Sequence, residues 1–227
     1  GALNSKYIKT FLEEYMVKPA FKNQWESYLY KTISNPNKKI KKAFIIAGTN
    51  SRGTAYGVFN ISKKIGVSPW YWWADVSTKN KKELILNQPD FYSKAPSVKY
   101  RGIFLNDEDW GLQPWAAKTF EPETGDIGPK TYAKIFELLL RLNANTIWPA
   151  MHPSTKAFFY YPKNAKMAEA FQIVLGTSHA EPMLRNNVDE WNKEEIGAFN
   201  YKTNKTNVLN YWDTRVEEVK HIDAIYS

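Results

Sequence analysis

The stretch KYRGIFLNDEDWG, residues 99–111, decides the fold. Its first part, residues 100–105, is short and rich in β-branched and aromatic side chains, which predicts a buried strand. Polar and acidic residues follow directly, over 106–109. In α/β barrels and open α/β sheets, chemistry is placed just past the carboxyl ends of the strands. We therefore expect this stretch to be the first strand of a barrel with an active-site rim attached.

Strands and helices alternate downstream of this stretch. Apolar residues at helical spacing predict helices over 129–142, 164–171 and 206–222. Asn143 can stop the first of these helices in a left-handed conformation. Short apolar runs predict strands over 145–150 and 173–178 and the start of a fourth strand at 224–227. Residues 112–128 are expected to form a long loop, of the kind that is often functional. Such alternation predicts parallel strands joined by helical crossovers.

The predicted fold class is α/β, with a small N-terminal α/β domain followed by the first half of a (β/α)8 TIM barrel. The first domain is expected over residues 1–96, incomplete at its start, and about four barrel units over 97–227. A closed barrel typically needs ~250 residues. A half barrel would leave open strand edges. We therefore expect the sequence to be an N-terminal fragment of a longer protein.

The N-terminal domain is predicted to contain a helix over 6–18, a turn at 35–37 and a strand over 43–47. A glycine-bounded turn over 48–54 leads into a helix that Gly66 can stop. Its glycines match neither GxGxxG nor a phosphate-binding P-loop. It is therefore either a tight strand-to-helix turn or a loop whose Asn50 and Arg52 reach a neighbouring site, where Arg can bind a carboxylate.

Composition excludes several classes of protein. Cysteine is absent, so disulfides and thiolate metal sites are excluded. No apolar stretch approaches the ~20 residues of a membrane span. The net charge of +8 is concentrated in residues 1–100, with 17 Lys and Arg against 6 Asp and Glu. That half could bind nucleic acid, but its scattered lysines are more typical of solvated loops. Aromatic residues make up 15%, which suits either a sugar-binding cleft or a large aromatic core.

Each predicted barrel strand is followed by chemically competent side chains. Asn106, Asp107 and Glu108 follow the first strand, His152 follows the second, and His179 with Glu181 follows the third. Histidines that follow strands are often packing residues, and acidic residues there can simply cap the strand ends. The two histidines and the carboxylates could also bind a metal ion, but their spacing along the chain is only a weak indication of a metal site. Glycoside hydrolysis would suit the set, because it uses two carboxyl groups around the scissile bond.

Four segments carry a resemblance to a known family. YRGIFLNDEDWGLQPWA (100–116), IGPKTYAKIFELLLRLNANTIWPAMH (127–152) and GTSHAEPMLRNN (176–187) resemble glycoside hydrolase family 115, whose members are xylan α-1,2-glucuronidases. Residues 45–76 also look like that family's N-terminal α/β domain. The resemblance implies a hydrolase that removes glucuronic acid, or its 4-O-methyl ether, from xylan with inversion. It implies no cofactor and no metal.

The resemblance also implies roles for individual residues. Asp107 would be a catalytic carboxylate, and Glu181 a second active-site carboxyl group. Residues at the other matching positions would bind the sugar: Asn106, Glu108, Trp148, His152, His179 and, from the N-terminal domain, Asn50 and Arg52.

One departure from the family pattern concerns the strand that begins at Ala224. The family carries an Arg-Gly-x-His-Asp segment there and a catalytic Glu further on, and this sequence ends before both. The resemblance therefore implies that the acid and base that transfer protons lie beyond residue 227. We therefore expect the fragment alone to be inactive; the alternative is a non-catalytic carbohydrate-binding or structural fragment. We expect a bacterial protein of carbohydrate metabolism, secreted or periplasmic and homodimeric at full length. Its partner would be xylan, with no nucleic acid or membrane.

Overall fold

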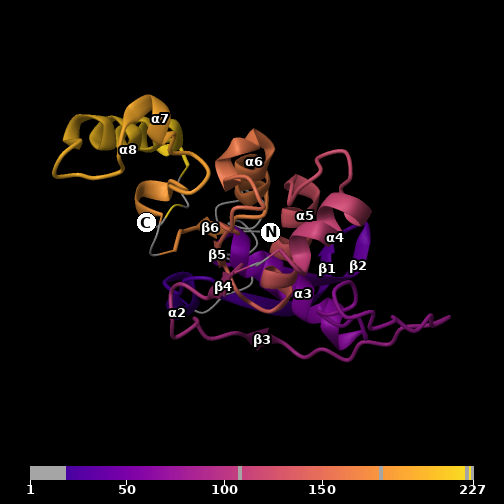
Figure 1. The fold of residues 1–227 in the computed structure, drawn as a ribbon. Helices are drawn as coiled ribbons and strands as arrows, with labels where there is room; N and C mark the ends of the chain where they lie inside the picture. The colour runs from indigo at the N-terminus through magenta and orange to yellow at the C-terminus, as the bar shows by residue number, and fades with distance from the viewer. Residues whose placement is uncertain (1–18, 107–108, 179–180, 223–224, 226–227) are drawn as a thin grey trace. The chain divides into compact units, whose positions relative to one another are not determined.

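The computed structural model describes residues 19–106, 109–178, 181–222 and 225. The chain divides into two compact units (Figure 1). The first comprises residues 1–99 with 140–144, and the second comprises 100–139 with 145–227. The helix expected over 6–18 lies outside the described residues. No helix in the described part of the chain is long and apolar enough to span a membrane.

An antiparallel sheet in the order β2-β1-β3 forms the centre of the first unit. The turn expected at 35–37 is wrong: β1 runs through these residues, and the chain reverses at Lys38 and Lys39. Asn35 has a φ of 50°, and the register shifts between Ser34 and Asn37, so this segment bends the strand instead of ending it. The elements of this unit are α2 (Pro19–Lys22), β1 (Tyr28–Asn37), β2 (Ile40–Gly48), α3 (Ser51–Lys64) and β3 (Phe91–Tyr92).

Helix α3 begins one residue after the side chain that caps it. The Asn50 side chain accepts a hydrogen bond from the Gly53 amide at 2.8 Å, which satisfies one of the first amides of the helix. The turn is therefore shorter than expected. The predicted stop at Gly66 is confirmed, since its φ of 106° is left-handed. Phe21, Leu29 and Ala47 form the buried core of the sheet.

The second unit is built on a parallel sheet in the order β4-β5-β6 (Figure 1). Gly102 to Phe104 pairs with Thr146 to Trp148, and Thr146 and Ile147 pair with Val174 and Leu175. Leu175 also bridges Ile225 in parallel, where the fourth strand is expected. The α/β class and the parallel order of the first three strands are thus confirmed, while barrel closure stays a prediction. The strands are β4 (Gly102–Phe104), β5 (Thr146–Trp148) and β6 (Val174–Leu175).

The helices of this unit differ from the expectations in detail. Residues 112–120 are helical within the expected loop, and their second part is a π-helix. Helix α6 starts at Pro162, which suits a first turn, and Asn164 is buried inside it. The helices are α4 (Leu112–Trp115), η1 (Ala116–Phe120), α5 (Pro129–Arg141), η2 (Phe158–Tyr160), α6 (Pro162–Ala170), η3 (Pro182–Leu184), α7 (Lys193–Ile196) and α8 (Lys205–Val219).

Helix α5 supplies much of the core of the second unit. Tyr132, Ile135, Phe136 and Leu139 are buried as the periodicity predicts, but Leu142 is 43% exposed, because α5 ends at Arg141. Asn143 then adopts the predicted left-handed conformation, with a φ of 58°.

Buried Glu121 caps the start of helix α5. Its carboxylate accepts hydrogen bonds from the amides of Lys130 and Thr131 at 3.1 and 3.0 Å. A carboxylate in this place satisfies amides that have no partner within the helix and complements the helix dipole.

Strands β4 and β5 approach each other closely at one position. A Cβ added to Gly102 would lie 1.7 Å from the carbonyl oxygen of Thr146. Only glycine therefore fits at this point of the sheet.

Candidate active site

Polar side chains lie past the carboxyl ends of the three parallel strands, where the sequence places them. Asn106 follows β4 and is exposed, His152 follows β5, and Glu181 follows β6. Asp107, Glu108 and His179 lie outside the described residues. Their predicted roles therefore stay predictions.

An aspartate–histidine pair joins the ends of β4 and β5. Asp109 Oδ1 lies 2.8 Å from His152 Nδ1, and both side chains are accessible, 46% and 37% exposed. An ionised carboxylate can only accept a hydrogen bond, so in this pair His152 donates through Nδ1. Sequence reasoning placed Asp109 in the acidic run but did not select it as a site residue. Its pairing with a residue 43 positions away leaves no signal in the sequence.

Glu181 is a buried carboxyl group, only 5% exposed. Its Oε2 accepts hydrogen bonds from the Ser178 amide at 3.3 Å and the Ser178 hydroxyl at 3.2 Å. Burial raises the pKa of Glu181 to about 7; the Ser178 hydrogen bonds oppose this rise, and the nearby charge of Glu190 adds to it. Glu181 can therefore hold or release a proton near neutral pH.

Hydrogen bonds around Met151 tie the end of β5 to the segment that follows β6. The Ser178 hydroxyl oxygen lies 2.7 Å from Met151 Sδ, and the Asn186 side-chain amide donates to the Met151 carbonyl at 3.1 Å. Met151 directly precedes His152, so these contacts also fix the backbone that carries the histidine. The site is thus held from two strands at once.

Two more carboxylates hold the loop after β5. Buried Asp126 accepts hydrogen bonds from the Thr155 hydroxyl at 2.7 Å, the Lys156 amide at 2.9 Å and the Tyr161 hydroxyl at 3.2 Å. Burial, with Asp126 beside it, raises the pKa of Tyr161 to about 12. Asp189 accepts from the Ala157 amide at 2.8 Å. The loop is therefore anchored from both sides.

A group of charged residues ties helix α8 to the segment after β6. Glu190 accepts hydrogen bonds from buried Arg185 at 2.9 Å and buried Arg215 at 2.5 Å. Its second oxygen accepts from the Asn186 amide at 2.7 Å. A buried carboxylate with two guanidinium partners is costly to disrupt, so this group makes the segment rigid.

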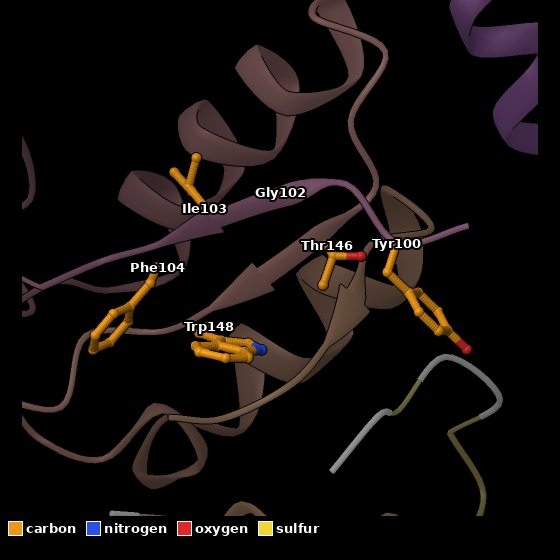
Figure 2. Close-up of a pocket in the computed structure, with 6 residues that line it drawn as sticks. All are labelled: Tyr100, Gly102, Ile103, Phe104, Thr146 and Trp148. Atoms are coloured by element: carbon orange, nitrogen blue, oxygen red, sulfur yellow. The ribbon is translucent and has the colours of Figure 1, made fainter. Parts of the chain in front are cut away.

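Trp148, another predicted sugar-binding residue, lines a pocket of about 320 Å³ on the sheet. Figure 2 shows Trp148, Phe104 and Thr146 on one side of the strands and Ile103 on the other. The rings of Phe104 and Trp148 meet edge to face, with centroids 5.9 Å apart. Three of the six described residues that line the pocket are aromatic, and such side chains can stack on the apolar faces of sugar rings.

Asn50 and Arg52 both have structural partners within the first unit. Asn50 caps α3, as described above. Arg52 Nε lies 2.5 Å from Oε1 of Glu26, which is 3% exposed. Their predicted contact with substrate stays a prediction. In the described part of the chain, no cluster of three or more His, Asp or Glu side chains could hold a metal ion.

Comparisons with known proteins identify the family of this chain. The sequence model of Glycosyl hydrolase family 115 matches residues 93–227. No curated protein matches the chain. A solved structure, described as a family 115 4-O-methyl-α-glucuronidase with specificity for decorated arabinogalactans, is 42% identical, with a TM-score of 0.84. The match covers 99% of this chain and 29% of that one, so this chain spans less than a third of its structural relative. The chain belongs to glycosyl hydrolase family 115.

Proposed function

We propose that the protein is an α-glucuronidase that removes glucuronic acid, or its 4-O-methyl ether, from a plant polysaccharide by inverting hydrolysis. Membership of family 115 supports this proposal, as does the 42% identity to a 4-O-methyl-α-glucuronidase. The chain would contribute part of the catalytic domain, because it corresponds to 29% of that relative.

The observation that carries the proposal is the buried Glu181 at the end of β6. A general acid must keep its proton at the working pH and release it in the transition state. Burial holds the pKa of Glu181 at about 7, which meets both needs near neutral pH. A raised carboxyl pKa beside an ionised partner is the arrangement that glycosidases use.

The proposed reaction breaks the bond between the anomeric carbon and the glycosidic oxygen. We propose that Glu181 gives its proton to that oxygen as the bond breaks, a role that the family resemblance instead assigns to a residue beyond position 227. A water molecule attacks the anomeric carbon from the opposite face and gives its proton to a second carboxylate, for which we propose Asp107. Inversion needs ~6.5–9.5 Å between the two carboxyl groups to admit this water.

The remaining site residues would bind and orient the uronic acid. His152 Nε2, held by Asp109, would form a hydrogen bond with a sugar hydroxyl, and Trp148 would stack on a ring. We keep the sugar-binding assignments of the other family positions as part of the proposal: Asn106, Glu108, His179, Asn50 and Arg52.

The polysaccharide itself has two candidates. The family resemblance favours xylan with α-1,2-linked side chains, and the solved relative is described as specific for decorated arabinogalactans. Both are extracellular polymers, so we propose that the protein is secreted or periplasmic. A homodimer at full length remains part of the proposal.

The test is release of uronic acid by the full-length protein from glucuronoxylan and from arabinogalactan, measured by chromatography. We expect release from at least one polymer. Proton NMR at early times should show the β-anomer first, because inversion converts the α-linkage. If the α-anomer appeared first, the proposed inverting mechanism would be wrong. No release from either polymer would overturn the enzyme proposal, and heat of binding without release would indicate the non-catalytic alternative. The 227-residue chain assayed alone is expected to show no turnover.

A further inference from the structure

The segment after β6 contains two consecutive non-glycine residues in the left-handed region. Met183 has a φ of 56° and Leu184 a φ of 59°. This conformation is unfavourable for side chains of this size and persists only where the surroundings impose it. Strained residues of this kind cluster at ligand-binding sites.

Three buried contacts impose the conformation of this turn. The Leu184 side chain is 4% exposed, and its carbonyl accepts a hydrogen bond from Arg215 Nη1 at 2.8 Å. The Arg185 amide donates to the Pro182 carbonyl at 3.2 Å, and Arg185 Nε donates to the Tyr211 carbonyl at 2.8 Å. Both arginines also bind Glu190, as described above. Helix α8 therefore holds the turn in place.

The side chain that this turn presents to solvent is Met183, which is 45% exposed. It follows Glu181 by two residues, so their Cα atoms lie no more than about 7 Å apart. Nearly half of the Met183 surface thus stays in solvent, so its burial stabilises the fold less than that of a core methionine. The packing of Met183 itself therefore offsets only part of the strain.

Left-handed residues elsewhere in this unit have evident roles. Gln172, with a φ of 57°, follows the C-terminal end of α6, a usual place for this conformation. Asp109, with a φ of 74°, carries the carboxylate that binds His152. Among the described residues of the second unit, Met183 and Leu184 are the other two non-glycine residues with a positive φ.

We propose that Met183 is a substrate-contact residue, whose thioether lies against an apolar face of the bound saccharide next to Glu181. Pyranose rings present C–H faces that favour apolar partners, and methionine adapts its shape to such surfaces. This inference rests on the proposed α-glucuronidase function, because it requires a saccharide at this end of the sheet.

The test compares four variants of the full-length protein in uronic acid release from its active polymer. Met183→Ala is expected to raise KM by about 10-fold, because the loss of one apolar contact with the substrate weakens binding by about this factor. Met183→Leu keeps the volume and is expected to stay within about threefold of wild type. Met183→Asn removes the thioether but suits the left-handed region, so KM should rise while Tm stays unchanged or rises by about 1–3 °C.

Gln172→Asn is the matched control, because it also introduces an asparagine at a position in the left-handed region, but outside the site. It should leave KM unchanged. Unchanged KM in both Met183→Ala and Met183→Asn would overturn the inference while wild-type release still supports the proposed function. Absence of release by the wild type would instead overturn the proposed function. A fall in Tm of Met183→Asn with no change in KM would also count against the substrate contact.

Discussion

Glu26 in the first unit and Glu181 in the second are both buried, and the difference between them lies in what surrounds each carboxyl group. Glu26, in the first unit, is 3% exposed and accepts hydrogen bonds from Arg52 Nε at 2.5 Å and the Tyr56 hydroxyl at 3.5 Å. Glu181, in the second unit, is 5% exposed, and the described residues offer it no paired cation. A buried carboxyl with a guanidinium partner serves the fold, whereas one held by a serine keeps an exchangeable proton for chemistry.

The largest effect is expected from Glu181→Gln, which removes the proton donor but keeps the shape. Uronic acid release should fall by about 10²- to 10⁴-fold, the usual contribution of general acid catalysis. The measurement is kcat on the active polymer. Glu169→Gln, on the exposed face of α6, is the matched control and should leave kcat unchanged. A Glu181→Gln variant with full activity would place the acid elsewhere.

Glu26→Gln should lower the free energy of unfolding by about 3 kcal/mol, because it leaves Arg52 beside a neutral partner. Urea unfolding measures this loss. If Arg52 serves the fold alone, KM at a temperature where the variant is folded should match wild type. A raised KM in the folded variant would indicate that Arg52 also reaches the substrate, as the family resemblance implies.

The raised pKa of Glu181 also predicts a dependence of stability on pH. The native state binds a proton between the ordinary value of 4.5 and about 7, where the unfolded state has lost it. The free energy of unfolding should therefore fall as pH rises through this window, by at most about 3 kcal/mol. Glu181→Gln should remove this slope. Urea unfolding of wild type and Glu181→Gln at pH 5 and pH 8 measures this dependence. If the free energy of unfolding changed equally with pH in both proteins, Glu181 would not be its source.

Asp109→Asn should have the smallest effect on catalysis, lowering kcat/KM by about 10-fold. The amide cannot replace a carboxylate as a purely accepting partner, so His152 loses one charge-assisted hydrogen bond and its fixed orientation. Asp213→Asn, at an exposed position of helix α8, is the control. Equal kcat/KM for Asp109→Asn and wild type would show that the pair does not act on the substrate.

The sequence predicted those parts of the fold that depend on residues close together in the chain. The apolar spacing of α5, the short runs of β4 to β6 and the left-handed stops at Gly66 and Asn143 all reflect interactions within a few residues. The π-helix at Ala116–Phe120 and the extension of β1 through Asn37 depend on packing and pairing with distant segments, which local patterns do not encode.

For the candidate site, the sequence predicted which polar residues follow the strands but not which residues they contact. The position of His152 and Glu181 after strands follows from the alternation of elements. The contact of Asp109 with His152 and the binding of Arg215 by Glu190 join residues 43 and 25 positions apart. Burial of Glu181, which raises its pKa, likewise depends on packing in the folded chain, which local sequence patterns do not encode.

Gly102 has a further consequence for how the parallel sheet assembles. Because the Thr146 carbonyl fills the space where a side chain would begin, β4 can align with β5 in only one way. A slip of two residues would keep every side chain on its own face, yet it would bring Tyr100 or Phe104 opposite Thr146 and their Cβ atoms into that oxygen. Gly102 thus favours one alignment of β4 with β5 over alignments shifted along the strands.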